Sequence, residues 1–197
     1  RIYTRHHTDF HHVSHPSAVK YDRLINRLSH QIIAVSETVK EVLIHMEQVA
    51  ENKVKIIHHG FDLGTFADPV LTRTDLVERY KLAEYHPKIG VISRFTDWKG
   101  IRYIIDAFRQ LLKEYPTAVL LLGNSIGEHG KQIRQKLNDL PPNNYRILDF
   151  EEEPAKLYSL FDIFVHVPVS AQSEAFGQVY IEALAAGIPS VFTRSGI

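Results

Sequence analysis

Short apolar runs rich in β-branched residues alternate with stretches of helical periodicity along most of the chain. The runs that we predict to be strands lie at 31–35, 54–58, 89–92, 118–122, 145–148, 163–167 and 190–193. Predicted helices follow them at 36–49, 101–115, 129–139, 153–161 and 179–186, with the clearest apolar periodicity at 101–115. Strands that alternate with helices form βαβ units, so the sequence predicts an α/β fold with parallel sheets.

A polar and charged stretch divides this alternation into two blocks. The first block occupies 1–68 and the second 87–197, and we interpret 69–86 as an interdomain segment. The chain begins with Arg1 rather than methionine and ends at Ile197, directly after a predicted strand. We therefore interpret the sequence as a piece of a longer protein.

Composition excludes several classes of protein. The 197 residues carry 23 basic and 23 acidic side chains, and this neutral balance argues against a dedicated nucleic-acid-binding protein. The absence of cysteine excludes a disulfide scaffold, a thiolate zinc site and a catalytic cysteine. No apolar run approaches the roughly 18 residues that span a bilayer.

The common nucleotide-binding motifs are also absent. The glycines after the predicted strand 118–122, Gly123, Gly127 and Gly130, do not have the G-x-G-x-x-G spacing. Gly130-Lys131 is followed by Gln132 rather than Ser or Thr, so the P-loop pattern fails as well. A classical dehydrogenase or P-loop NTPase is therefore disfavoured.

Histidine is abundant, with 12 residues, of which His6, His7, His11 and His12 are crowded near the start of the chain. Such crowding raises the question of a metal site, but no H-E-x-x-H pattern is present. We favour loop or surface histidines over a metal site.

Two cations lie on one predicted strand-to-helix loop. Arg94 follows the strand 89–92, and Lys99 immediately precedes Gly100 at the start of the helix 101–115. Ligands of open α/β sheets bind at the carboxyl ends of strands, which is where this loop lies. Arg94 and Lys99 can therefore bind a diphosphate, which the helix N-terminus also attracts. The alternative is two solvated loop charges.

Two glutamates flank the start of a later helix. Glu174 lies in the loop before the predicted helix 179–186, and Glu182 lies within it. Gly177 allows close backbone approach there, and free N–H groups at the helix N-terminus can bind a phosphate. Glu182 can accept hydrogen bonds from ribose hydroxyls, the alternative being an exposed helical glutamate. For Asp62 we favour a structural Asx turn.

These motifs, in this order, resemble those of the family 4 glycosyltransferases of the GT-B type. The stretch from Glu174 to Gly187 resembles the family's E-x7-E motif, and Arg94 with Lys99-Gly100 resembles its G-R…K-G element. Residues 60–66 resemble the N-G-V-D…F hinge, with His59 in place of the usual Asn, and residues 34–36 resemble its A-V-S strand end. Ala175 also departs from the family, in which Gly, Ser or Pro is commoner. The resemblance covers essentially the whole chain.

The resemblance implies two Rossmann-like parallel-sheet domains, both incomplete in this chain. Residues 1–68 would be the last part of the acceptor-side domain, and 87–197 most of the donor-binding domain. It also implies a retaining glycosyltransferase of the hexosyltransferase type. Such an enzyme moves a sugar from a UDP-, GDP- or ADP-linked donor to a glycan or lipid-linked acceptor, as in polysaccharide biosynthesis. Neither a metal nor another cofactor is implied.

The resemblance also assigns roles to particular residues. Arg94 and Lys99 would bind the donor diphosphate and stabilise the leaving group, and Glu174 would contact the donor sugar. Backbone N–H groups near Phe176, Gly177 and Val179 would assist, Glu182 would hold the ribose, and Gly123 and the segment 148–150 with Phe150 would flank the base. The active-site histidine would be His7, with His6 as the alternative.

Two other functions stay open at this point. A GT-B-type nucleotide-sugar epimerase would use the same diphosphate grip with additional acid/base carboxylates, and a non-catalytic nucleotide-sugar-binding module would not turn over. We expect a cytoplasmic protein, with peripheral contact to the cytoplasmic face of a membrane as an open alternative.

Overall fold

The computed structural model of the chain describes residues 1–67, 70–148 and 150–196, which form two compact units. Unit 1 contains Arg1–Phe61, Pro168–Gln178 and Arg194–Ile197, and unit 2 contains Asp62–Val167 and Val179–Thr193. Each unit has its own sheet, and all the strand pairs in both sheets are parallel. The α/β class with two parallel sheets, predicted from the alternation of strands and helices, is confirmed.

Unit 1 is built on a three-stranded sheet of order β1-β2-β3. Its elements are β1 (Ile2–Arg5), α1 (Phe10–Ser14), η1 (Pro16–Ala18), α2 (Val19–Leu28), β2 (Gln31–Ala34), α3 (Glu37–Glu41), η2 (Val42–Met46), η3 (Glu51–Lys53) and β3 (Val54–Ile56). The helix predicted over 36–49 is shorter in the structure. It begins as expected, with the Ser36 hydroxyl accepting the Val39 N–H, but passes into the π-helix η2. It ends before Gln48, whose φ of 58° lies in the left-handed region.

Unit 2 contains a five-stranded sheet of order β6-β5-β4-β7-β8. Its elements are α4 (Gly64–Ala67), α5 (Val70–Arg79), β4 (Lys88–Ile92), η4 (Asp97–Lys99), α6 (Ile101–Leu111), β5 (Val119–Gly123), α7 (Gly130–Leu137), η5 (Pro142–Asn144), β6 (Tyr145–Ile147), α8 (Pro154–Tyr158), β7 (Ile163–His166), α9 (Gln178–Ala185) and β8 (Ser190–Phe192). Among the described residues, none of the helices is both long enough and apolar enough to cross a membrane.

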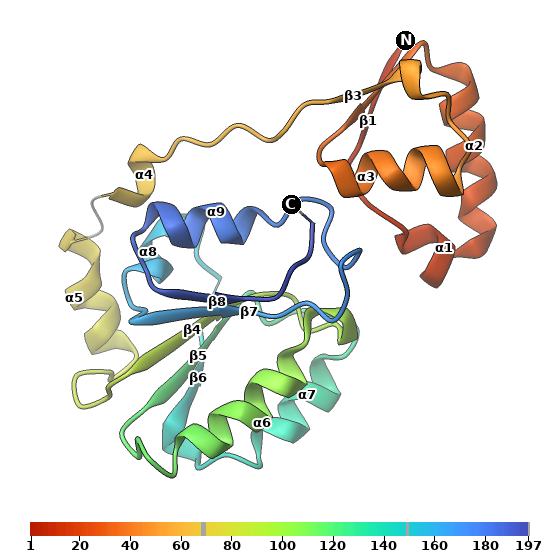
Figure 1. Cartoon of the computed structure of the whole chain (residues 1–197). Coiled ribbons are helices and arrows are strands. Elements are labelled where there is room, and N and C mark those ends of the chain that lie inside the picture. Colours follow the sequence, from red (N-terminus) through yellow and green to blue (C-terminus); the bar gives the residue numbers. More distant parts are fainter. Residues whose placement is uncertain (68–69, 149, 197) are drawn as a thin grey trace. The chain divides into compact units, whose positions relative to one another are not determined.

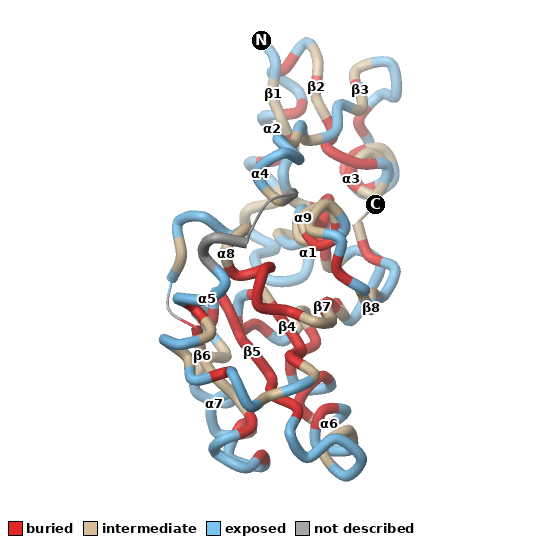
Figure 2. The backbone as a smooth tube through the Cα atoms, turned by 90° about the vertical axis from the view of Figure 1, so that its left-hand side faces the viewer, coloured by how far each residue is buried: buried red, intermediate tan, exposed pale blue. Residues whose placement is uncertain are grey.

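The sheet of unit 2 is covered on both faces. Helices α6 and α7 lie on one face, and α8 and α9 lie on the other (Figure 1). Side chains of β5 alternate between them: Leu120 and Leu122 join the cluster of α6 and α7, whereas Val119 and Leu121 join that of α8 and α9. Figure 2 shows β4 and β5 as the buried centre of this unit.

The polar segment 69–86 contains the helix α5, which belongs to unit 2. Leu76 of α5 and Leu82 after it are buried in the same apolar cluster as Val119 and Leu121. Asp68 and Pro69 lie outside the described residues. The domain boundaries expected from the sequence, 1–68, 69–86 and 87–197, stay a prediction.

The order of the strands in unit 2 reverses beside β4. The chain runs from β4 outward through β5 to β6, and then returns to place β7 on the other side of β4. Gly100, which precedes α6, lies against the carbonyl oxygen of Val167 just after β7, and its φ is +72°. A Cβ at this position would come within 2.1 Å of that oxygen. Gly100 therefore permits the close approach of the β4–α6 loop to the end of β7.

We predict that Gly100→Ala lowers the free energy of unfolding by about 2–4 kcal/mol, because it adds a backbone clash to a left-handed φ. Gly130→Ala is the matched control, since a Cβ on Gly130 meets nothing within 4 Å. Chemical denaturation should leave the control within about 0.5 kcal/mol of the wild type. Equal stabilities of the two variants would contradict the role of Gly100.

Candidate functional site

The loop between β4 and α6 carries the two cations that the sequence singled out. Arg94 is exposed and Lys99, the last residue of η4, is partly buried. The N-terminus of α6 follows directly, and its N-cap residue, Gly100, has no side chain to cap it. The loop leaves the carboxyl end of β4, where the strand order of the sheet reverses, and this is the place where open α/β sheets bind their ligands.

A second loop, which follows β5, holds the first one in place. The Phe95 N–H donates to the Ile126 carbonyl at 2.8 Å, and the His129 N–H donates to the Phe95 carbonyl at 3.0 Å. A Cβ on Gly127 would come within 2.4 Å of the Phe95 carbonyl oxygen. Gly127 therefore permits the close contact between the two loops.

Two residues predicted to flank a base lie at the ends of neighbouring strands. Gly123 is the last residue of β5 and is buried. Phe150 follows β6, the strand paired with β5, and 82% of its surface is exposed. Asp149, within the predicted segment 148–150, lies outside the described residues.

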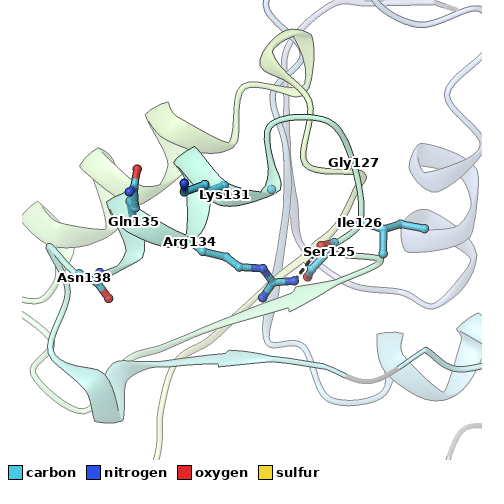
Figure 3. Close-up of a pocket in the computed structure, with 8 residues that line it drawn as sticks. Ser125, Ile126, Gly127, Lys131, Arg134, Gln135 and Asn138 are labelled. Carbon is cyan, nitrogen blue, oxygen red and sulfur yellow. Dashed lines mark hydrogen bonds between the residues drawn. The ribbon is translucent and has the colours of Figure 1, made fainter.

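A shallow pocket beside the loop after β5 adds cations that the sequence analysis did not select. It is lined by residues of that loop, including Ser125 and Gly127, and by residues of α7, including Lys131 and Arg134 (Figure 3). The Arg134 guanidinium donates to the Ser125 carbonyl at 3.1 Å, and its carbon lies 5.6 Å from the centre of the Phe95 ring. The i, i+3 spacing of Lys131 and Arg134 after a glycine-rich loop was the available sequence signal.

Glu182 on α9 is half-buried rather than an exposed helical glutamate. Its carboxylate accepts a hydrogen bond from the Tyr158 hydroxyl at 2.8 Å. Burial raises the pKa of Glu182 above its ordinary value of 4.5, and the hydrogen bond from Tyr158 opposes this rise. Burial, followed by the charge of Glu182, raises the pKa of the Tyr158 hydroxyl.

The segment with Glu174 belongs to unit 1. Glu174 is buried, with 9% of its surface exposed, and its N–H donates to the Ser195 hydroxyl at 3.0 Å. Phe176 packs against the rings of His58, His59 and Phe61, at centroid distances of 5.6, 5.1 and 6.0 Å. The segment before α9 is thus anchored to unit 1 by one hydrogen bond and three ring contacts.

The end of the Glu174 segment carries the remaining predicted donor contacts. Gly177 has a φ of +84°, a conformation that favours glycine, and α9 begins directly after it at Gln178. Val179 is the second residue of α9, so its N–H lies in the first turn, where helix N–H groups lack intrahelical acceptors.

His7 lies just beyond the end of β1, whereas the alternative, His6, is exposed and stacks on His59 at 5.5 Å. The His7 ring packs on that of His11 at 4.3 Å, and its Nε2 lies 3.9 Å from the Asp22 carboxylate. Burial is the largest cause that lowers the pKa of His7 below 6.5, and Arg5 and His11 lower it further while Asp22 opposes them. His7 is therefore mainly the neutral imidazole at pH 7.

The interpretation of His11 and His12 as loop or surface residues needs correction. Their side chains are only 27% and 16% exposed, because each contacts a buried carboxylate: Asp22 for His11 and Glu47 for His12. Ligand atoms of His7, His11 and Asp22 lie within 4.8 Å of one another and could hold a metal. Asp22, however, is already paired with Arg5 as well as His11, which favours a charge network.

The predicted site residues divide between the units. Arg94, Lys99, Gly123, Phe150, Val179 and Glu182 belong to unit 2, and His7, Glu174, Phe176 and Gly177 belong to unit 1. The Asx turn favoured for Asp62 is confirmed, since its carboxylate accepts the Gly64 N–H at 3.2 Å. The sequence analysis did not identify Arg5, Asp22 and Glu47 as buried residues, because no local sequence pattern indicates that a charged side chain is buried.

Two family models match the chain. The model described as Glycosyl transferases group 1 matches residues 72–197, and that described as Glycosyltransferase Family 4 matches residues 1–65. Among curated proteins, the chain is 29% identical over 166 residues to the capsular polysaccharide biosynthesis glycosyltransferase CapM of Staphylococcus aureus. That match covers 83% of this chain and 43% of CapM, so the chain spans less than half the length of this relative.

Solved structures show the same fold. HepE of Anabaena in complex with UDP-glucose is 25% identical, with a TM-score of 0.85 over 99% of this chain and 53% of HepE. A glycosyltransferase of Rickettsia africae is 26% identical, with a TM-score of 0.75 over 91% of this chain and 48% of its own. These likenesses confirm the GT-B fold that the sequence motifs implied.

The buried pair of Tyr158 and Glu182 generates a pH-dependent prediction. Because the folded pKa of Glu182 is raised, the free energy of unfolding is highest while the carboxyl is protonated, and it decreases as pH rises through that pKa. Tyr158→Phe removes the hydrogen bond that opposes the raised pKa, and should cost about 1–3 kcal/mol once Glu182 is ionised.

Denaturation of Tyr158→Phe should therefore show a loss of stability that grows as pH rises above 4.5 and Glu182 ionises. In a Glu182→Gln background, the same substitution should show a loss that does not change with pH. A pH-independent loss with Glu182 present would contradict the coupling.

Proposed function

The chain belongs to the group 1 glycosyl transferases, and on this premise we propose that its protein is a retaining sugar-nucleotide glycosyltransferase. It transfers a sugar from a nucleoside-diphosphate donor to a glycan or lipid-linked acceptor. The observation that carries the proposal is the loop of Arg94 and Lys99, which leads to the N-terminus of α6 where the strand order reverses.

The chemistry of the transfer explains why cations are needed at this loop. The bond between the anomeric carbon and the diphosphate oxygen breaks, and a bond from that carbon to the acceptor oxygen forms on the same face of the sugar. The acceptor proton leaves with the departing diphosphate. Arg94, Lys99 and the N-terminus of α6 stabilise the negative charge that develops on the diphosphate.

The other predicted residues act on the remaining parts of the donor. Glu174 binds the hydroxyls of the donor sugar, and N–H groups near Phe176, Gly177 and Val179 assist. Glu182 binds the ribose, and Gly123 and Phe150 flank the base. The burial of Glu174 and Glu182 supports these roles, because a desolvated carboxylate binds a hydroxyl more strongly than one in water does.

His7 contacts the donor sugar from the acceptor side. Its lowered pKa supports this role, since a neutral imidazole can accept a hydrogen bond from a sugar hydroxyl. CapM is named for capsular polysaccharide biosynthesis, and we propose a related surface glycan or glycolipid as acceptor. We also propose a cytoplasmic localisation, with contact to the cytoplasmic face of a membrane.

We predict that Arg94→Ala with Lys99→Ala abolishes detectable binding of the nucleoside diphosphate. Two charge-assisted contacts contribute about 1.5–3 kcal/mol each, so the Kd should rise about 10²–10⁴-fold. Calorimetric titration of the whole protein with UDP, GDP and ADP measures this and identifies the base.

The control for this experiment is Arg109→Ala with Lys113→Ala, which removes two exposed cations of unit 2 and should leave the Kd unchanged. Unchanged binding in the Arg94 and Lys99 double variant would overturn their assignment. Transfer of a labelled sugar to an acceptor separates the enzyme from an epimerase, which keeps the label on the nucleotide.

We predict that Glu174→Ala lowers kcat about 10²–10³-fold while the Kd for the nucleoside diphosphate changes less than about twofold, since Glu174 acts on the sugar. Glu114→Ala, at an exposed glutamate of unit 2, is the control and should alter neither quantity. Equal losses in kcat and nucleotide affinity would reassign Glu174 to the nucleotide.

A further inference from the structure

Arg5, the last residue of β1, has a completely buried guanidinium. Arginine is almost never fully buried unless it is paired, and here the guanidinium donates two hydrogen bonds and forms one further ion pair. Its Nε donates to the His7 carbonyl at 3.2 Å, one terminal nitrogen binds Glu47, and the other lies 3.2 Å from Asp22. The guanidinium therefore joins the His7 backbone to two carboxylates from different parts of unit 1.

Both carboxylates are themselves buried and bound by further side chains. Asp22 of α2 is 3% exposed and also contacts Nδ1 of His11 at 2.7 Å. Glu47, directly after η2, is 6% exposed; it accepts from Asn26 at 2.6 Å and contacts His12 at 3.2 Å. We refer to Arg5, Asp22, Asn26, Glu47, His11 and His12 as the buried charge network.

The buried charge network reaches His7 by two routes. Through Arg5 it fixes the carbonyl of His7, and hence the path of the backbone where β1 ends. Through Asp22 it fixes the ring of His11, against which the ring of His7 packs at 4.3 Å. The backbone and the ring of His7 are thus both held by groups that share the Asp22 carboxylate.

Stability alone does not account for such a network. Taking charges out of water costs free energy, and replacing a buried ion pair by apolar residues of similar volume is often neutral or stabilising. The network supplies geometry, because a planar guanidinium that donates to His7 and Glu47 and pairs with Asp22 restricts the arrangement of the segments that meet on it.

We propose that Arg5, Asp22 and Glu47 are positioning residues that hold the His7 imidazole in its working orientation. This inference rests on the proposed function, in which His7 contacts the donor sugar. The three residues act through His7 and touch no substrate themselves. Substitution of any of the three displaces the imidazole. Binding of the diphosphate by Arg94 and Lys99, which belong to unit 2, is retained.

The first test is Arg5→Lys in the whole protein, with steady-state transfer measured well below the melting temperature of the variant. A lysine keeps the charge but cannot donate to His7 and Glu47 from one plane while it also pairs with Asp22. We expect kcat to fall about 10–100-fold, while the Kd for the nucleoside diphosphate stays within about twofold of the wild type. Asp22→Asn is the second variant, should Arg5→Lys fail to fold, and the same result is expected from it.

A double-mutant cycle separates positioning from a merely structural role. In a His7→Ala background, Arg5→Lys or Asp22→Asn should lower kcat no further, because the group on which the network acts is gone. Additive losses, or an unchanged kcat in both single variants, would overturn the proposal. The control is Lys40→Met, which breaks the Lys40–Glu51 ion pair of 2.9 Å in the same unit and should leave kcat unchanged.

Failure of this inference can be told apart from failure of the proposed function. If the wild type transfers no sugar, or if His7→Ala is fully active, the proposed function or its use of His7 fails, and the inference falls with it. If His7→Ala is inactive and the network variants are fully active, only the inference fails.

Discussion

A parallel strand that is buried on both faces requires helices on both sides of its sheet, and the architecture of unit 2 follows from this requirement. β4 and β5 are buried along nearly their whole length, so α6 and α7 cover one face and α8 and α9 the other. Each crossover helix starts from the carboxyl end of a strand. The loops that carry Arg94, Gly123 and Phe150 are therefore gathered at one edge, without any attraction among these residues themselves.

Close backbone approach then shapes this edge. Gly100 lets the loop after β4 lie against Val167, and Gly127 lets the loop after β5 lie against Phe95. The loop that is tied in this way carries the exposed Arg94 and leads to the N-terminus of α6. In unit 1, by contrast, the charged side chains of Arg5, Asp22 and Glu47 are buried. They act on backbone geometry rather than on a ligand that binds from solvent.

Sequence periodicity predicted the strands and most helices of unit 2, because their apolar patterns are set by local spacing. It failed for α2, and the reason is physical. The buried residues of α2 are polar, Asp22 and Asn26, whereas its apolar residues Tyr21, Leu24 and Leu28 are more than half exposed. A rule that assigns apolar side chains to the inside would place the wrong face of this helix against the sheet. Helix α5 was missed because its charged composition is typical of a linker, although Leu76 is buried.

The sequence by itself determined the α/β class, the order of most elements from β2 onward, and the motifs that resemble the glycosyltransferase family. Each of these depends on residues close together in the chain, such as Arg94, Lys99 and Gly100. Only the tertiary structure decided which charges are buried and with what partners. The Tyr158–Glu182 bond joins residues 24 positions apart, and the Arg5–Glu47 bond joins residues 42 positions apart. Burial of a charged side chain costs free energy unless the fold brings a partner to it. When that partner is distant in the sequence, no local pattern of residues indicates it.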